Sequence, residues 1–380
     1  MDSGRPVSPS SLRQLLTYYL RLGTTGFGGP IALAGYMERD LVEERGWISK
    51  VDYKRSLALA QLAPGPLAAQ LAIGLGYSHS GVLGATLVGI AFIMPSFLMT
   101  VGLSIAYVAY GGLPWMQALF YGIGAAVMGI IARSAYKLTK STVGDRKLLW
   151  AIYAVMAGVT AVTRREIASL FFLSGAVALI VYAPPKRLAL GAALPAWLLA
   201  PIGGSAARGT VGEIFFFFAK AGAFVFGSGL AVVPFLYGGV VQRFHWLTER
   251  QFLDAVAVAM ITPGPVVITV AFIGYLVAGL GGSCAAALGI FLPVYLFVVI
   301  PAPWFWKNGS NPQVEAFVDG VTAAAVGALT GAVLVLARGA IKDVPTAAIA
   351  AASLFALVKY KTPEPLIVGA AGALGLLISR

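Results

Sequence analysis

The sequence predicts an all-α polytopic membrane protein of two homologous six-helix repeats, with broken helices and about 13 transmembrane segments at roughly 20 residues per crossing. Hydrophobic residues make up 59% of its 380 residues and charged residues 11%, whereas soluble domains have about 45–50% and about 25%. The mean hydropathy is +0.85. The 46 glycines and 21 prolines suit membrane helices that pack closely and break. This composition excludes a soluble enzyme, a disordered chain and a fibrous protein.

Apolar segments occur in two sets of six, joined by one short segment at 188–202. The first set covers residues 12–37, 56–77, 82–110, 114–138, 148–162 and 167–183. The second set covers residues 213–237, 252–279, 283–304, 314–338, 344–358 and 365–378. We therefore divide the chain into a first repeat at 1–187, a linking transmembrane segment and linker at 188–212, and a second repeat at 213–380. No cleavable signal is expected, so the first span serves as the insertion signal.

An internal repeat relates the two sets. The motifs at 27–30, 64–66 and 47 recur at the same offset of 199 residues (226 − 27, 263 − 64 and 246 − 47). Five further positions recur at an offset of 198, namely Gly81 and Gly279, Pro95 and Pro293, Pro114 and Pro312, Gly122 and Gly320, and Gly129 and Gly327. So many matches in register indicate that both halves share one fold.

The number of crossings decides how the repeats are oriented. Six crossings per repeat plus one linking span at 188–202 place the second copy upside down, which is the inverted-repeat plan of many secondary transporters. If 188–202 does not cross, the copies are parallel. We expect the inverted arrangement.

Four helix breaks form the predicted substrate-binding site. Proline removes a backbone donor and, beside glycine, unwinds a helix, which hydrocarbon tolerates only where the freed groups face protein or a wet cavity. A helix that restarts after such a break presents free N–H groups that suit an oxyanion. The breaks are Phe27, Gly28, Gly29, Pro30; Pro64, Gly65, Pro66; Phe226, Gly227, Ser228, Gly229; and Pro263, Gly264, Pro265. The alternative is that these are kinks used only for packing.

Polar side chains flank the breaks. Gln61 and Gln70 lie on either side of the first Pro-Gly-Pro, and Thr262 and Thr269 lie on either side of the second. Their amide and hydroxyl groups can donate hydrogen bonds to an oxyanion. They can equally join helices to one another, and the sequence leaves both roles open.

One cation lies inside the first span of each repeat. Arg21 and Lys220 are repeat equivalents, and Lys220 follows four consecutive phenylalanines. Cations at this depth are costly and usually functional, although either can extend its charge to the headgroups. Together they would suit a divalent anion, because Arg offers a bidentate fork and Lys a point charge.

A charged stretch at 38–47 follows the first break. Read as a gate, it makes Arg39, Arg45 and Trp47 candidates for meeting the solute, with Trp246 as the equivalent in the second repeat. Read as an interfacial amphipathic helix, it places Trp47 at the headgroups as an anchor.

The remaining composition limits cofactors and partners. One cysteine and two histidines argue against a disulfide or a metal site, and we expect no cofactor. The net charge of +12 is interpreted as positive-inside anchoring or as attraction of an anion, not as nucleic-acid binding. The expected partners are a small divalent oxyanion and the lipid bilayer; a homodimer is left open.

These motifs together resemble the chromate ion transporter family of bacterial inner-membrane proteins, in its long two-domain form. The resemblance rests on the motifs at 27–30, 38–47, 61–70, 226–229 and 262–265, and it covers nearly the whole chain. It implies chromate efflux, shared with sulfate-like anions and driven by the proton gradient. Many members carry a histidine three residues after the proline of the first motif, where this chain has Leu33.

The expected function is therefore secondary transport of chromate or a related divalent oxyanion across a bacterial inner membrane. One alternative is a passive anion channel. The other is a membrane-embedded enzyme acting on an anionic lipid. Enzymes of that kind need clustered acids or metal ligands. Only 38–44 offers such a cluster, and its counterpart at 237–243 lacks acids, which disfavours catalysis.

Overall fold

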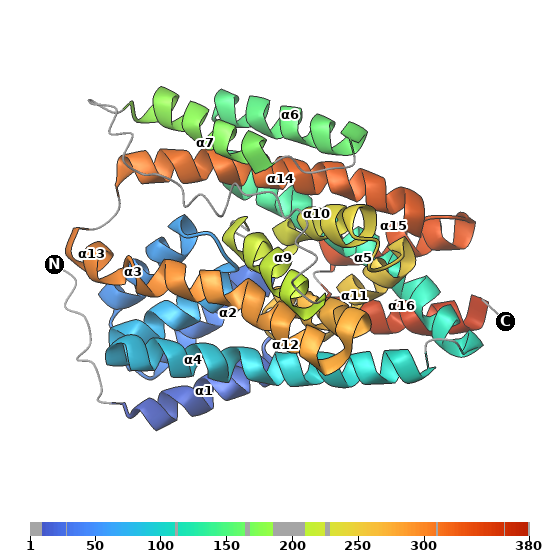
Figure 1. Cartoon of the computed structure of the whole chain (residues 1–380), viewed down its shortest axis with the longest axis horizontal. Coiled ribbons are helices and arrows are strands. Elements are labelled where there is room, and N and C mark those ends of the chain that lie inside the picture. Colours follow the sequence, from blue (N-terminus) through green and yellow to red (C-terminus); the bar gives the residue numbers. More distant parts are fainter. Residues whose placement is uncertain are drawn as a thin grey trace.

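The structure, a computed structural model, is all-helical. It describes residues 10–27, 29–110, 113–163, 168–184, 210–224, 229–308, 311–360 and 362–378, and these ranges contain no β-strand. Its longest helices lie side by side along the long axis of the molecule (Figure 1).

The helices of the two halves follow one another in the same order. The first half contains α1 (Leu12–Thr25), α2 (Gly29–Met37), the π-helix η1 (Glu38–Glu44), α3 (Lys50–Leu62), α4 (Leu67–Tyr110), α5 (Pro114–Val143), α6 (Lys147–Thr163) and α7 (Ala168–Tyr182). The second contains α9 (Thr210–Phe224), η2 (Gly229–Val232), α10 (Val233–Leu236), the π-helix η3 (Tyr237–Arg243), α11 (Glu249–Ile261), η4 (Val266–Ile268), α12 (Thr269–Val299), α13 (Ala302–Asn308), α14 (Pro312–Ala340), α15 (Val344–Lys359) and α16 (Glu364–Ile378).

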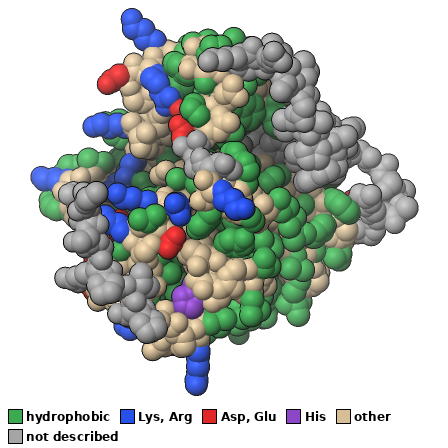
Figure 2. Space-filling view, turned by 90° about the vertical axis from the view of Figure 1, so that its left-hand side faces the viewer, with side chains coloured by type: hydrophobic (Ala, Val, Ile, Leu, Met, Phe, Trp, Pro, Cys, Tyr) green, Lys and Arg blue, Asp and Glu red, His purple; other side chains and the backbone are tan. Residues whose placement is uncertain are grey.

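Length and surface chemistry confirm the multi-pass membrane class. Four helical stretches are long and apolar enough to cross a bilayer: Leu67–Tyr110, Pro114–Val143, Val266–Lys307 and Pro312–Ala340. Four shorter helices, α6, α7, α15 and α16, are also apolar. Leucines on the long helices are widely exposed, such as Leu83 at 62% and Leu288 at 65%, as lipid-facing residues should be. Figure 2 shows Lys and Arg gathered on one end of the molecule, beside a hydrophobic surface. The count of 13 crossings stays a prediction, and the segment at 188–202 lies outside the described residues.

Sharp turns divide both α4 and α12. The backbone leaves helical geometry at Ser80–Gly81 and at Ala278–Gly279, and the two glycines have φ of 60° and 59°. Glycine adopts this left-handed conformation without steric cost. Each helix therefore has a short arm before its turn and a long arm after it, and the turns fall at matching positions of the two halves.

The Pro-Gly-Pro breaks are the tips of helical hairpins. A Cβ on Gly74 would lie 3.2 Å from Cβ of Ser56, so α3 and the short arm of α4 pack antiparallel on either side of the turn at 64–66. α3 has 13 residues, about 20 Å of helix, against a hydrocarbon thickness of about 30 Å. We expected an interrupted crossing at 56–77; the structure instead shows a hairpin that turns back at its tip. α11 has the same 13 residues at the corresponding positions.

The outer helices of each half cover a helix of the other half. α6 and α7 lie beside α14 (Figure 1), and α15 and α16 pack on α5. Glycines make these contacts close, and they do so reciprocally: a Cβ would meet the carbonyl oxygen of the opposing helix at Gly122 (Ala371), Gly129 (Ala350), Gly320 (Ser174) and Gly327 (Tyr153). This reciprocity is typical of a twofold relation between two copies.

The long arms of α4 and α12 run alongside one another in opposite directions (Figure 1). Thr86, near the start of the first long arm, hydrogen-bonds Tyr295, near the end of the second, with 2.7 Å between their hydroxyl oxygens. Equivalent helices of the two halves are therefore antiparallel where they touch.

The glycine contacts can be tested on α5. Gly122→Ala places a Cβ 2.0 Å from the Ala371 carbonyl oxygen, so the helices must separate and the Tm of the detergent-solubilised protein should fall by several degrees. Gly124→Ala on the same helix meets nothing within 4 Å. This control should keep or slightly raise the Tm, because alanine is the better helix former by about 1 kcal/mol. Equal Tm values for both variants would contradict the packing described.

Candidate functional site

The four helix breaks meet in the interior of the molecule. They line one small space, which we call the central pocket, formed by Gly29, Pro30, Leu33, Pro66, Ala68, Gly229, Gly264, Pro265 and Val266. Its volume is about 10 Å³, which is room for about one water molecule. Each break contributes at least one residue, whereas Gly28 and the residues Phe226, Gly227 and Ser228 lie outside the described residues.

The tip of the second hairpin docks on the first half. The backbone N–H of Gly264 donates to the carbonyl oxygen of Gly26 at 2.9 Å. Ser96 Oγ, on the long arm of α4, donates to the carbonyl oxygens of Pro263 at 2.7 Å and Gly23 at 3.3 Å. Gly264 has φ of +92°, and a Cβ there would lie 2.0 Å from Ser96 Oγ. Only glycine allows this approach.

The tip of the first hairpin also lies against the second half, through an apolar contact. A Cβ on Gly65 would lie 3.1 Å from Val294 on the long arm of α12, the position equivalent to Ser96. Gln70 is fully buried, and its Nε2 donates to the carbonyl oxygens of Pro64 at 2.7 Å and Ala63 at 3.2 Å. Its Oε1 is buried with no hydrogen-bond partner in the described residues. The Gln70 amide therefore shapes the tip.

The other polar side chains expected at the site are also engaged locally. The hydroxyl of Thr262 donates to the Val258 carbonyl oxygen, and that of Thr269 donates to the Val266 carbonyl oxygen. Gln61 is exposed and does not line the central pocket. An anion near the tips would therefore depend on backbone N–H groups and on cations.

A larger cavity of about 760 Å³ opens beside the first break. We call it the arginine vestibule; its lining residues are Tyr18, Arg21, Leu22, Thr25, Gly26, Phe27, Tyr36, Arg39, Asp40, Glu44, Arg45, Pro363, Glu364 and Pro365. Because Gly26 lines the vestibule and Gly264 lines the central pocket, the hydrogen bond between them lies in the partition between the two spaces.

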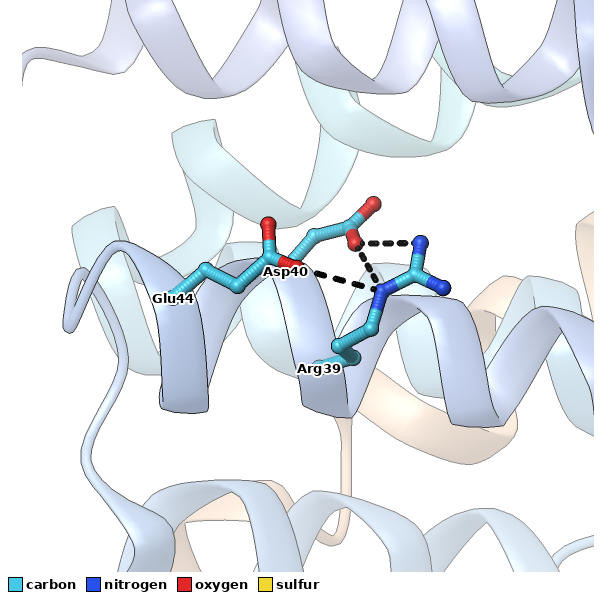
Figure 3. Close-up of polar contacts among 3 residues, drawn as sticks. All are labelled: Arg39, Asp40 and Glu44. Carbon is cyan, nitrogen blue, oxygen red and sulfur yellow. Dashed lines mark hydrogen bonds and ion pairs between the residues drawn. The ribbon is translucent and has the colours of Figure 1, made fainter.

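The three arginines of the vestibule differ in their partners. Arg39 is held by Asp40 at 2.8 Å and by Glu44 at 3.5 Å (Figure 3), and the Asp40 carboxylate raises the pKa of Arg39. Arg45 instead lies over the rings of Trp47 and Tyr18, at 4.6 Å and 5.5 Å from their centroids. In the part of the chain that the structure describes, neither Arg45 nor Arg21 forms an ion pair.

The second half has aromatic residues where the first half has the vestibule. Phe217, Phe235, Phe244 and Trp246, which we call the aromatic cluster, occupy the positions equivalent to Tyr18, Tyr36, Arg45 and Trp47. Phe244 stacks on Trp246 at 4.6 Å, and Phe217 stacks on Phe235 at 5.5 Å. Trp246, a gate candidate from the sequence, thus belongs to this cluster.

The two cations predicted inside the first spans do not share a cavity, and Arg21 is exposed. Arg21 lines the vestibule, whereas Lys220, half-buried on α9, lines neither the vestibule nor the central pocket. Arg243 lies close enough to act on the charge of Lys220. The roles predicted for both residues stay predictions.

One buried acid, Asp254, is not among the site residues predicted from the sequence. Asp254 on α11 is 3% exposed and accepts a hydrogen bond from Tyr107 Oη at 2.7 Å. The sequence signal for it is a single carboxylate within the apolar stretch Phe252–Met260.

The fold and the site together define a class: a multi-pass α-helical membrane transporter whose interrupted helices meet in its interior. The chain belongs to the chromate transporter family, since the model of that family matches residues 13–182 and 212–376.

Three relatives match nearly the whole chain. It is 61% identical to the chromate transport protein of Cupriavidus metallidurans, over 97% of this chain and 93% of that protein. It is 57% identical to the probable chromate transport protein of Synechococcus elongatus, over 99% and 98%. It is 32% identical to the chromate transport protein of Pseudomonas aeruginosa, over 97% and 93%. No solved structure matches the chain. The chain is therefore a transporter and not the membrane-embedded enzyme considered above.

The docking of the second tip can be tested at Ser96. Ser96→Ala leaves the buried Pro263 carbonyl oxygen without its side-chain donor, which should cost about 1–3 kcal/mol and lower the Tm. Ser104→Ala is the matched control, because Ser104 is equally buried on the same helix and its Oγ donates to the Thr100 carbonyl oxygen one turn earlier. A Ser104→Ala variant that loses as much stability as Ser96→Ala would contradict a special role for Ser96.

Proposed function

We propose that the protein is a secondary transporter that moves chromate, or a related divalent oxyanion such as sulfate, across a bacterial inner membrane. The proposal includes efflux coupled to the proton gradient. It rests on one observation: four helix breaks line the central pocket, with an open arginine vestibule beside it in one half and an aromatic cluster at the equivalent place in the other half. The names of the relatives suggest chromate as the substrate.

The chemistry of the vestibule favours an oxyanion. Guanidinium groups bind tetrahedral oxyanions through charged, often bidentate hydrogen bonds. Arg39 is already bound by two carboxylates, so Arg21 and Arg45 are the arginines that can receive a solute. Arg45 lies over two aromatic rings, which hold the guanidinium without neutralising it.

The closed centre favours a carrier over the passive channel. The central pocket of about 10 Å³ holds about one water molecule, too little for a tetrahedral oxyanion. The partition formed by Gly26 and Gly264 must therefore move for the solute to enter. Restarted helices such as α4, which begins directly after Pro66, would then offer backbone N–H groups to the anion.

Inverted repeats would place the aromatic cluster at the opposite face of the membrane from the vestibule. The antiparallel contact between Thr86 and Tyr295 and the reciprocal covering of α5 and α14 support this arrangement. In that case the structure is a state open to one side, with the other mouth closed by stacked rings. Rocking of one half against the other would exchange the two states.

Neutralising the free arginines should reduce transport. Each of Arg21→Gln and Arg45→Gln removes a charged hydrogen-bond donor, worth about 1.5–3 kcal/mol, so chromate flux in proteoliposomes should fall about tenfold or more at low substrate concentration. Sulfate should compete with chromate in the wild type, and a monovalent anion should compete less.

Arg13→Gln on α1 provides the control, because Arg13 is exposed and does not line the vestibule. Unchanged chromate flux in Arg45→Gln, at equal protein levels, would remove the vestibule from the transport path.

The inversion can be tested by labelling cysteines with a membrane-impermeant maleimide. Cys284 is the one cysteine of the chain, so Cys284→Ala provides a cysteine-free background. Arg45→Cys should react from one face of oriented vesicles, and Phe244→Cys, its equivalent, should react from the opposite face. Reaction of both positions from the same face would indicate parallel repeats.

A further inference from the structure

Asp254 is buried in a part of the fold where a charge is expensive. It lies on α11, one turn after Arg250, and only 3% of its surface is exposed. An ionised carboxylate in such surroundings requires strong partners, and one without them is driven toward its neutral form. Among the described residues its single hydrogen-bond donor is Tyr107, at 2.7 Å.

The neighbouring charge does not neutralise Asp254 directly. The guanidinium of Arg250 donates to the Gln117 carbonyl oxygen at 3.1 Å, and no ion pair joins Arg250 to Asp254 in the described part of the chain. The elements packed against α11 are α4, α5, α12, α14, α16, η3 and η4. Among their described side chains, Tyr107 of α4 lies close enough to act on the Asp254 charge, as does Arg250 of α11 itself.

A small polar cavity gives Asp254 access to water. Its volume is about 160 Å³, and it is lined by Tyr107, Met116, Gln117, Phe120, Arg250 and Asp254. At roughly 30 Å³ per water molecule this is room for several waters. The Tyr107 ring packs edge-on against Phe120 and Phe272, with centroids at 5.4 Å and 5.1 Å, which aims its hydroxyl at the carboxylate. A proton can therefore reach Asp254 through water and leave by the same cavity.

Asp254 is mechanically connected to the transport site. It lies seven residues before Ile261, the last residue of α11, about 10 Å of helix, and that helix leads directly into the tip that docks on Gly26 and Ser96. The equivalent residue in the first half is Arg55, which is exposed. Of the two hairpins, therefore, only the second carries at this place a group that can exchange a proton.

We propose that Asp254 binds the coupling proton, an inference that rests on the proton-coupled transport proposed above. In one state the carboxylate takes a proton from cavity water and becomes a neutral acid, which lowers the cost of burying α11. In the other state the acid returns the proton to water and becomes charged again. No electron is transferred, and each cycle moves one proton opposite to the oxyanion.

The test separates net transport from exchange in proteoliposomes. Chromate is measured above its second ionisation, so that the substrate stays divalent on both sides. Asp254→Asn should lose about tenfold or more of the flux driven by a pH gradient, while exchange of chromate across the membrane at equal pH persists, because exchange needs no net proton movement. Asp145→Asn, on the exposed turn between α5 and α6, should retain both activities.

A second variant keeps the acid and alters its surroundings. Tyr107→Phe removes the hydroxyl that stabilises the charged carboxylate, so the pH dependence of net flux should shift to higher pH. This variant decides the question if Asp254→Asn does not fold, and an unchanged pH profile in it would then overturn the assignment.

The outcomes distinguish this inference from the proposed function. If the wild type and Asp254→Asn respond equally to the pH gradient, Asp254 is not the proton site, but coupled transport stands. If the wild type exchanges chromate without responding to the gradient, proton coupling and the Asp254 assignment both fall. If the wild type moves no chromate, the proposed function itself fails.

Discussion

The rest of the structure depends on how the backbone freed by the helix breaks is satisfied inside the protein. An unwound segment at membrane depth persists only where its polar groups find protein or water. Here the first half satisfies the second tip, since Gly26 accepts from Gly264 and Ser96 donates to Pro263, while Gln70 satisfies the first tip from within its own half. The hairpin tips can therefore lie in the interior, and the central pocket exists because both tips and both first breaks converge there. The same contacts form the partition between the central pocket and the arginine vestibule.

Equivalent positions in the two halves have different chemistry. The vestibule carries Arg45 where the aromatic cluster carries Phe244. A guanidinium keeps its surroundings polar and solvated, whereas stacked phenyl and indole rings exclude water and fill space. The two halves also differ at the hairpins, where Asp254 is buried and Arg55 is exposed. A shared backbone thus supports a polar cavity in one half and a packed aromatic cluster in the other, and it buries a carboxylate in the second hairpin where the first exposes a guanidinium.

The positions of the helix breaks could be predicted because proline and glycine act locally. The breaks at Pro64–Pro66 and Pro263–Pro265 follow from backbone chemistry alone, and the structure brings them together. The use of individual side chains could not be predicted. Gln70 has the donors that an oxyanion needs, but they donate to the carbonyl oxygens of its own tip. Lys220 stands amid apolar residues, yet it lines neither cavity. Whether a donor is available depends on which carbonyl lies nearest, and that is a property of the fold.

The sequence by itself determined that this protein is helical, lies in a membrane and repeats its breaks at a constant spacing. It could do so because hydropathy and the backbone effects of proline and glycine act within a few residues along the chain. Only the tertiary structure decided that the Pro-Gly-Pro segments are tips of hairpins and that α6 and α7 cover the opposite half. It also decided that Tyr107 meets Asp254 across 147 positions of the chain. The reason is physical: the direction a helix takes after a break, and the groups it then meets, are set by close packing between segments far apart in sequence.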